Sequence, residues 1–158
     1  MVDQIMNHIR EGVGNPPIVF VHGYLCELEN WRHQVDHFQA TTTVLACDLR
    51  GLGKTPLGNG EMTIEQMGQD VAALLAHHDL TNAVLVGHSM GGPVALEAAR
   101  LLKGRVDMVI GADTLGDVSL RYPMSNSRGC APPWTLISPA RWKAWCAVVS
   151  SYPHQIPR

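Results

Sequence analysis

Four short and mostly apolar runs recur along the first two-thirds of the chain, and each stops at a glycine or a polar residue. They comprise residues 18–21, 44–47, 83–86 and 106–110. Continuous apolar runs that are rich in β-branched residues are typical of strands buried on both faces of a parallel sheet. Residues 5–10 carry a weaker version of this pattern, which predicts an edge strand.

The segments between these runs have the spacing of amphipathic helices. Thr63 with Gln66 three positions later resembles a capping box and predicts a helix that begins there. Asn30 is predicted to cap a shorter helix that ends at Phe38, and residues 90–103 are predicted as a third helix. This alternation predicts an α/β fold: a doubly wound, mostly parallel sheet with helices on both faces. Ligands of such sheets bind beyond the carboxyl ends of the strands.

Composition changes near residue 117 and divides the chain into two parts. All 14 acidic residues of the 158-residue chain lie at or before Asp117, whereas residues 118–158 contain basic residues but no carboxylate. A folded enzyme normally mixes both signs of charge over its whole surface. We therefore predict a folded core over residues 1–117 and an atypical tail over residues 118–158.

Charge and hydropathy argue against several classes of protein. The 12 basic and 14 acidic side chains give a net charge of −2, which does not favour a nucleic-acid partner. No apolar run reaches the ~20 residues of a membrane-spanning helix, and residues 1–10 lack the apolar core of a secretory signal. The four cysteines lie far apart, so we predict reduced thiols in a cytoplasmic protein.

The sharpest chemical signal is the sequence GHSMGG at residues 87–92, between a predicted strand and a predicted helix. This context suits a nucleophile elbow, a strained turn that raises the Ser89 hydroxyl above the sheet edge. Gly87 and Gly91 leave room for the close backbone approach that such a turn requires. The following helix directs its free N–H groups at the same point. The alternative is a glycine-rich turn that carries a capping serine.

A second segment, residues 21–24, predicts the rest of an acyl-transfer site. Such a site stabilises an oxyanion with two N–H groups, one from the residue after the nucleophile and one from the loop after an earlier strand. Met90 and Tyr24 are the candidates for these two donors. His22, Gly23 and His88 are predicted to support the loop and the elbow, because a histidine beside a turn glycine often bonds to local backbone.

Two further patterns predict neither a cofactor nor a metal site. Residues 48–55 end in Gly-Lys-Thr, but a phosphate-binding loop needs a glycine where Asp48 stands. Asp48 and Arg50 are therefore predicted to make structural contacts. His33 and His37 have the i, i+4 spacing of a helical zinc site without its glutamate or a third ligand, so a solvated helix face is predicted.

Together these segments resemble the α/β-hydrolase superfamily of the serine hydrolase type. His22-Gly23 followed by Trp31 is similar to its oxyanion loop, residues 48–55 to its D-x-R-G-x-G-x-S stretch, and residues 87–92 to its elbow. The resemblance covers roughly residues 5–113 and implies an incomplete hydrolase fold, truncated after the sixth strand. It also implies a serine hydrolase that cleaves small carboxylic esters through an acyl-enzyme. Ser89 argues against the epoxide hydrolases and dehalogenases of the superfamily, whose nucleophile is aspartate.

The resemblance further implies an acid and then a histidine after the serine. Asp113 follows the run at residues 106–110, and His154 is the only histidine after Ser89. A strand-end aspartate bonded to local backbone and a solvated terminal histidine are the alternatives. Two functions therefore stay open. One is a small-molecule ester hydrolase; the other is a truncated, catalytically impaired chain that associates through an exposed sheet edge.

Overall fold

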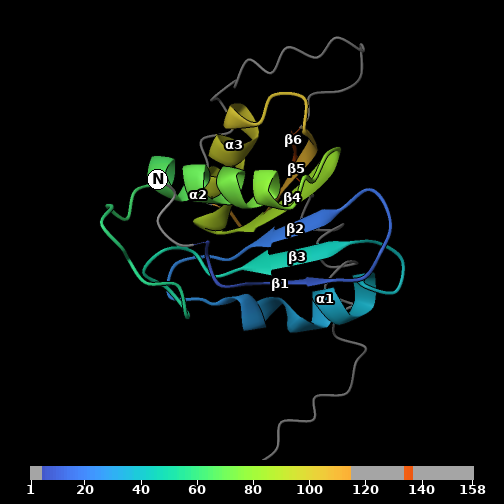
Figure 1. Cartoon of the computed structure of the whole chain (residues 1–158), viewed down its shortest axis with the longest axis horizontal. Coiled ribbons are helices and arrows are strands. Elements are labelled where there is room, and N and C mark those ends of the chain that lie inside the picture. Colours follow the sequence, from blue (N-terminus) through green and yellow to red (C-terminus); the bar gives the residue numbers. More distant parts are fainter. Residues whose placement is uncertain (1–4, 115–133, 137–158) are drawn as a thin grey trace, which may run out of the picture.

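The computed structural model describes residues 5–114 and 134–136, and within them six strands form one sheet. The strands follow the order β1-β3-β2-β4-β5-β6 across the sheet (Figure 1). Only β1 is antiparallel to its neighbour, and the other four pairings are parallel. The strands are His8–Glu11 (β1), Ile18–Val21 (β2), Val44–Cys47 (β3), Ala83–His88 (β4), Val106–Ala112 (β5) and Trp134–Leu136 (β6).

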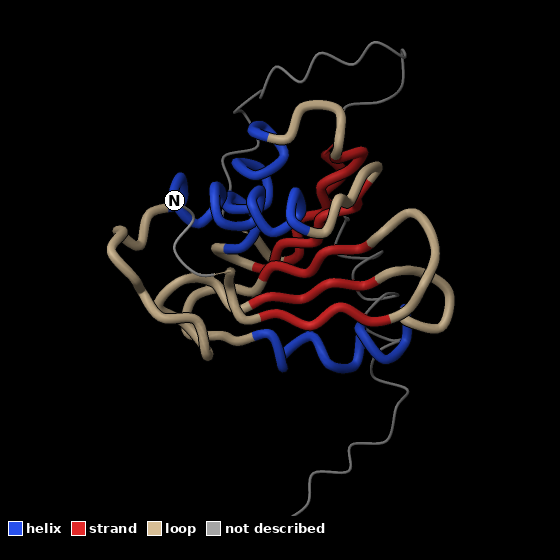
Figure 2. The backbone as a smooth tube through the Cα atoms, in the orientation of Figure 1, coloured by secondary structure: helices blue, strands red, loops and turns tan. Residues whose placement is uncertain are grey.

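Helices cover both faces of this sheet, as Figure 2 shows. A 3₁₀ helix, Leu28–Trp31, leads directly into α1, Arg32–Phe38, on one face. The other face carries α2, Ile64–His77, and α3, Gly91–Leu101. The prediction of a doubly wound, mostly parallel α/β sheet is therefore confirmed. None of the described helices is long and apolar enough to cross a bilayer.

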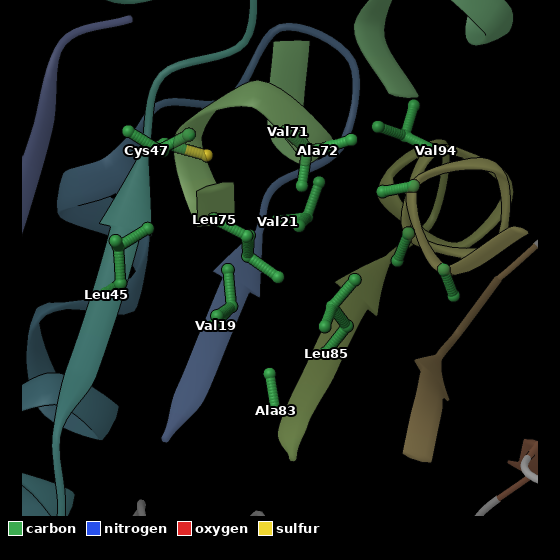
Figure 3. Close-up of a cluster of buried hydrophobic side chains, with 14 of the residues drawn as sticks. Val19, Val21, Leu45, Cys47, Val71, Ala72, Leu75, Ala83, Leu85 and Val94 are labelled. Carbon is green, nitrogen blue, oxygen red and sulfur yellow. The ribbon is translucent and has the colours of Figure 1, made fainter. Parts of the chain in front are cut away.

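Each central strand is apolar on both sides because it contributes to two separate cores. Val19 and its sheet neighbours Leu45 and Leu85 belong to the larger core, against α2 and α3 (Figure 3). Phe20 points the opposite way and stacks on Trp31 with ring centroids 4.7 Å apart. Successive side chains of a strand alternate between faces, so a strand covered by helices on both sides is apolar at every position.

The local structure confirms one predicted helix cap and corrects another. Thr63 caps α2 as predicted, since its side chain accepts a hydrogen bond from the Gln66 N–H at 3.2 Å. Asn30 does not cap α1, because the chain already turns at residue 28 and α1 continues directly from that 3₁₀ helix. The Asn30 side chain instead accepts a hydrogen bond from the Glu27 N–H at 2.8 Å.

The second difference is β6, which pairs in parallel with β5 and was not predicted. Its three residues are too few to produce a recognisable hydrophobic pattern. The remainder of the predicted tail, including His154, lies outside the described residues. The division of the chain at residue 117 therefore stays a prediction.

Phe20 offers a test of the smaller core. We expect Phe20→Ala to lower the free energy of unfolding by about 3–5 kcal/mol, because the ring is fully buried between the sheet and Trp31. Urea denaturation followed by circular dichroism measures this change. Val13→Ala is the control, since Val13 is 91% exposed and its truncation should leave the unfolding midpoint almost unchanged. Equal midpoints for the two variants would contradict this description of the core.

Candidate active site

The Ser89 backbone occupies a strained turn at the carboxyl end of the sheet. Ser89 lies between β4 and α3 with φ at 50°, in the left-handed region that side-chain-bearing residues rarely adopt. Its N–H donates to the Ala112 carbonyl at 3.0 Å. Its carbonyl accepts from the Gly92 N–H at 3.0 Å and from the Thr114 hydroxyl at 2.8 Å. Contacts from β5 and α3 therefore hold the turn on both sides.

The glycines that flank Ser89 are required by close backbone contacts. A Cβ atom at Gly87 would lie 2.6 Å from the Gly92 Cα atom, and one at Gly91 would lie 2.6 Å from the His22 carbonyl oxygen. Real Cβ atoms essentially never come within 3.0 Å of such atoms. The chain therefore leaves β4, turns at Ser89 and enters α3 in a space that admits no side chain at either position.

The loop after β2 packs against this turn. A Cβ atom at Gly23 would lie 3.1 Å from the Ser89 Cβ atom and 3.1 Å from the His88 Nδ1 atom. Tyr24 follows with its side chain 60% exposed, and Met90 is the N-cap of α3. Among the described residues, no group accepts a hydrogen bond from the main-chain N–H of Tyr24 or Met90. Within residues 5–114 and 134–136, two amide donors without an acceptor thus lie on the two segments that meet at Ser89.

Both ring nitrogens of His22 form hydrogen bonds that hold the loop after β2. The side chain is 1% exposed, its Nδ1 atom lies 2.8 Å from the Gly23 carbonyl oxygen, and its Nε2 atom lies 3.0 Å from the Leu49 nitrogen. Because the Leu49 amide can only donate, Nε2 accepts and Nδ1 carries the proton. Burial lowers the pKa of His22, which keeps the ring neutral. Neither ring nitrogen is free for proton transfer.

The segment after β3 is organised around the buried carboxylate of Asp48, which is 1% exposed. Asp48 accepts hydrogen bonds from the N–H groups of Leu28 at 2.7 Å and Lys54 at 2.8 Å. The Lys54 amide, which would hold a phosphate in a nucleotide-binding loop, is therefore already used within the protein. Arg50 pairs with Asp70 of α2 at 2.5 and 2.6 Å. Both residues thus make structural contacts.

Asp113 is the candidate acid that the structure places near Ser89. It comes directly after β5, is exposed, and has φ at 46°. Its neighbours Ala112 and Thr114 are the two residues that hydrogen-bond to the Ser89 backbone from this side. The candidate base, His154, lies outside the described residues. In the described part of the chain, no histidine forms a hydrogen bond with the Ser89 hydroxyl.

Other nucleophiles and ligand sites are less suited to chemistry. Within residues 5–114, burial raises the pKa of the Cys47 thiol to about 12, so it is not a nucleophile at neutral pH. No three metal-ligating side chains gather anywhere in the described ranges. A cavity of about 570 Å³ lies between residues 55–60 and α2, but the Arg50 guanidinium that lines it is already paired with Asp70.

Comparison with known proteins identifies the family. The model of the alpha/beta hydrolase fold matches residues 16–134, and the chain therefore belongs to this family. The chain is 39% identical over 95 residues to the dihydrolipoyllysine-residue acetyltransferase component of the acetoin cleaving system of Pseudomonas putida, covering 60% of this chain. It is 32% identical over 117 residues to 3-oxoadipate enol-lactonase 2 of Acinetobacter baylyi, covering 73% of this chain.

Solved structures agree with this assignment. A thermophilic esterase from Thermogutta terrifontis superposes with a TM-score of 0.65 and 34% sequence identity, covering 70% of this chain and 40% of the esterase. The chain spans 26% of the length of the Pseudomonas protein and 44% of the lactonase. The range that the family model matches, residues 16–134, contains β2 to β5, the loop after β2 and the turn at Ser89.

The bonding of His22 generates a stability prediction. We expect His22→Ala to lower the free energy of unfolding at pH 7.5 by about 2–4 kcal/mol, because the Leu49 N–H and the Gly23 carbonyl lose their buried partner. The lowered pKa means that the unfolded chain binds a proton at His22 that the folded chain does not. Stability from this group is therefore lost as pH falls below about 6.5, and the difference from the variant should shrink.

Urea titrations of both proteins between pH 5 and pH 8 measure this dependence. The control is His33→Ala on the exposed side of α1, which should change the unfolding free energy by less than about 0.5 kcal/mol at every pH. A difference between the His22 variant and the parent that grows with falling pH would contradict a neutral, doubly bonded ring.

Proposed function

We propose that this chain carries a serine hydrolase site for small carboxylic esters. The observation that carries the proposal is the strained turn at Ser89. Gly87 and Gly91 make room for this turn, and the loop that carries the Tyr24 amide packs against it. A side chain in an unfavourable backbone conformation persists only where surrounding contacts impose it, and such strain concentrates at functional sites. The two relatives named for esterase and lactonase activity are compatible with ester chemistry on this fold.

In the proposed reaction, the Ser89 hydroxyl oxygen attacks the acyl carbon and loses its proton to a base. The carbonyl oxygen becomes an oxyanion, to which the N–H groups of Tyr24 and Met90 donate. The carbon–oxygen bond to the alcohol then breaks, and the alcohol leaves with the proton from the base. Water attacks the acyl-enzyme by the same route, which releases the carboxylic acid and restores Ser89.

The proposal assigns proton transfer to residues after β5. Asp113 orients the base, because it follows the strand end that is bonded to the Ser89 backbone. His154 is the base, or a histidine from outside the chain takes its place. Free thiols at Cys26 and Cys47 fit the cytoplasmic location proposed for the protein.

A second candidate is an α/β-hydrolase-like chain that keeps the elbow without turnover. The observation in its favour is that the described histidines leave Ser89 without a base: His22 uses both ring nitrogens in the backbone of its own loop. A serine of ordinary pKa is a weak nucleophile when no base removes its proton. The two candidate functions therefore predict different reactivities for the Ser89 hydroxyl oxygen.

Labelling with a fluorophosphonate separates the two candidates. If the site is competent, Ser89 should react about 100-fold or more faster than serines of the same chain unfolded in urea, because oxyanion donors stabilise the addition. Ser89→Ala should remove the label, as shown by intact-mass spectrometry. Labelling of the folded chain no faster than of the unfolded chain would support the candidate without turnover.

Gly23 tests the contact between the loop and the elbow. We expect Gly23→Ala to slow fluorophosphonate labelling about tenfold or more, because the new methyl group would press on the Ser89 and His88 side chains at 3.1 Å. Gly58→Ala is the control, because nothing lies within 4 Å of the Gly58 Cβ position. Its φ of +66° strains alanine there, so the control also shows whether local backbone strain alone slows labelling. A similar labelling rate in both variants would refute the contact.

A further inference from the structure

The peptide unit between Ser89 and Met90 joins an anchored carbonyl to an N–H that has no acceptor among the described residues. The Ser89 carbonyl accepts a hydrogen bond from the Thr114 hydroxyl at 2.8 Å and another from the Gly92 N–H at 3.0 Å. A peptide unit is planar, and in its trans form the carbonyl and the N–H point in opposite directions. Whatever orients the Ser89 carbonyl therefore also orients the Met90 N–H.

The Thr114 side chain is held in place beside this peptide. Thr114 lies two residues beyond Ala112, the last residue of β5. A Cβ atom at Gly92 would lie 2.7 Å from the Thr114 Cβ atom, so the threonine packs directly on the backbone of α3. The Ser89 N–H donates to the Ala112 carbonyl at 3.0 Å. Both peptide units that flank Ser89 are thus bonded to the segment that ends β5, which fixes both of its backbone dihedral angles.

We propose that Thr114 is a positioning residue that directs the Met90 N–H at the oxyanion. This inference rests on the proposed function, in which the N–H groups of Tyr24 and Met90 donate to that oxygen. The Thr114 hydroxyl holds the Ser89 carbonyl toward the end of β5, so the Met90 N–H points away from it. β2 lies on the other side of β4, and the loop after β2 carries Tyr24. The two donors thereby converge on one oxygen atom.

The hydrogen bond from Thr114 also strengthens the donor. A hydrogen bond to a carbonyl oxygen polarises the peptide unit and makes its N–H a better donor. A donor whose direction is set beforehand costs no reorganisation when negative charge develops. Both effects act on the addition step, in which the oxygen becomes negative, and not on the binding of a neutral reagent. Thr114 is therefore expected to affect the rate constant of the reaction rather than the affinity.

Three substitutions separate the Thr114 hydroxyl from the packing of its side chain. Thr114→Val replaces the hydroxyl with a methyl group and removes the donor, whereas Thr114→Ser keeps the hydroxyl and removes the methyl group. Thr42→Val is the matched control, because the buried Thr42 side chain also donates to a backbone carbonyl, that of Pro16. Thr42 precedes β3, at the end of the parallel strands opposite to Ser89.

The test is fluorophosphonate labelling of the full chain over a range of reagent concentrations, which separates the labelling rate constant from the half-saturating concentration. Complete loss of an oxyanion donor lowers a rate about 100- to 1000-fold, and Thr114 acts only through such a donor. We therefore expect Thr114→Val to lower the rate constant about tenfold and to change the half-saturating concentration less than about twofold. Thr114→Ser should restore most of the rate constant, and Thr42→Val should not lower it.

Three outcomes of this labelling would overturn the proposal. They are an unchanged rate constant in Thr114→Val, a slower reaction that arises only from a higher half-saturating concentration, and a loss that Thr114→Ser does not rescue. Circular dichroism reports whether each variant is folded at the temperature of the measurement. Thr114→Ala removes the same hydroxyl and takes the place of Thr114→Val if that variant does not fold.

Nuclear magnetic resonance separates this inference from the proposed function. The ¹⁵N shift of the Met90 amide responds to hydrogen bonding at the carbonyl of the same peptide unit. Thr114→Val should move this signal, and Thr42→Val should not. If the parent chain labels no faster than the unfolded chain, the proposed hydrolase fails, and the Met90 signal still decides whether Thr114 orients the peptide. A moved signal supports that contact, and an unchanged signal overturns it.

Discussion

The position of Ser89 depends on direct contact between backbone segments. Gly91 lies against the carbonyl groups at the end of β2, Gly87 lies against the first turn of α3, and the Ser89 amide and carbonyl are bonded to the segment that ends β5. Each contact joins main-chain atoms or a short hydroxyl, which have little freedom to move. Interiors packed at this density transmit any added volume to their neighbours. The ends of three neighbouring strands therefore fix the backbone of Ser89.

The loop that faces Ser89 is held by a second, polar set of contacts. His22 joins this loop to the backbone after β3, and Asp48 in that segment binds the N–H of Leu28 and the side chain of Asn7. A buried carboxylate is costly unless its oxygens receive hydrogen bonds, and here both oxygens do. The same bonds tie the N-terminal segment and the 3₁₀ helix to the loop. The geometry around Tyr24 thus depends on buried residues outside the loop that carries it.

The sequence predicted most of the fold because β2 and β3 are apolar at every position and because glycines flank Ser89 at the spacing that a sharp strand-to-helix turn requires. The runs at residues 18–21 and 44–47 are strands with the predicted bounds, since helices cover both of their faces. Asn30 was misplaced because a 3₁₀ turn before α1 has no distinctive apolar period. The bond from Thr114 to the Ser89 carbonyl could not be predicted, because 25 residues separate the two and only the tertiary fold brings them together. His154 and the residue 117 boundary remain predictions.

In the proposed hydrolase, the nucleophile and the proton-transfer residues lie in different parts of the chain, and this division limits what the turn at Ser89 can do alone. Ser89 and Met90 lie between β4 and α3, and Tyr24 lies in the loop after β2, all beside elements that pack into the described core. Oxyanion donors stabilise negative charge only after the serine oxygen has attacked, and the attack requires a base. Correct geometry at Ser89 therefore does not by itself establish catalysis. In the proposed reaction the base comes from a part of the chain that the central strands do not position, so the core could keep its fold while the proposed site loses its base.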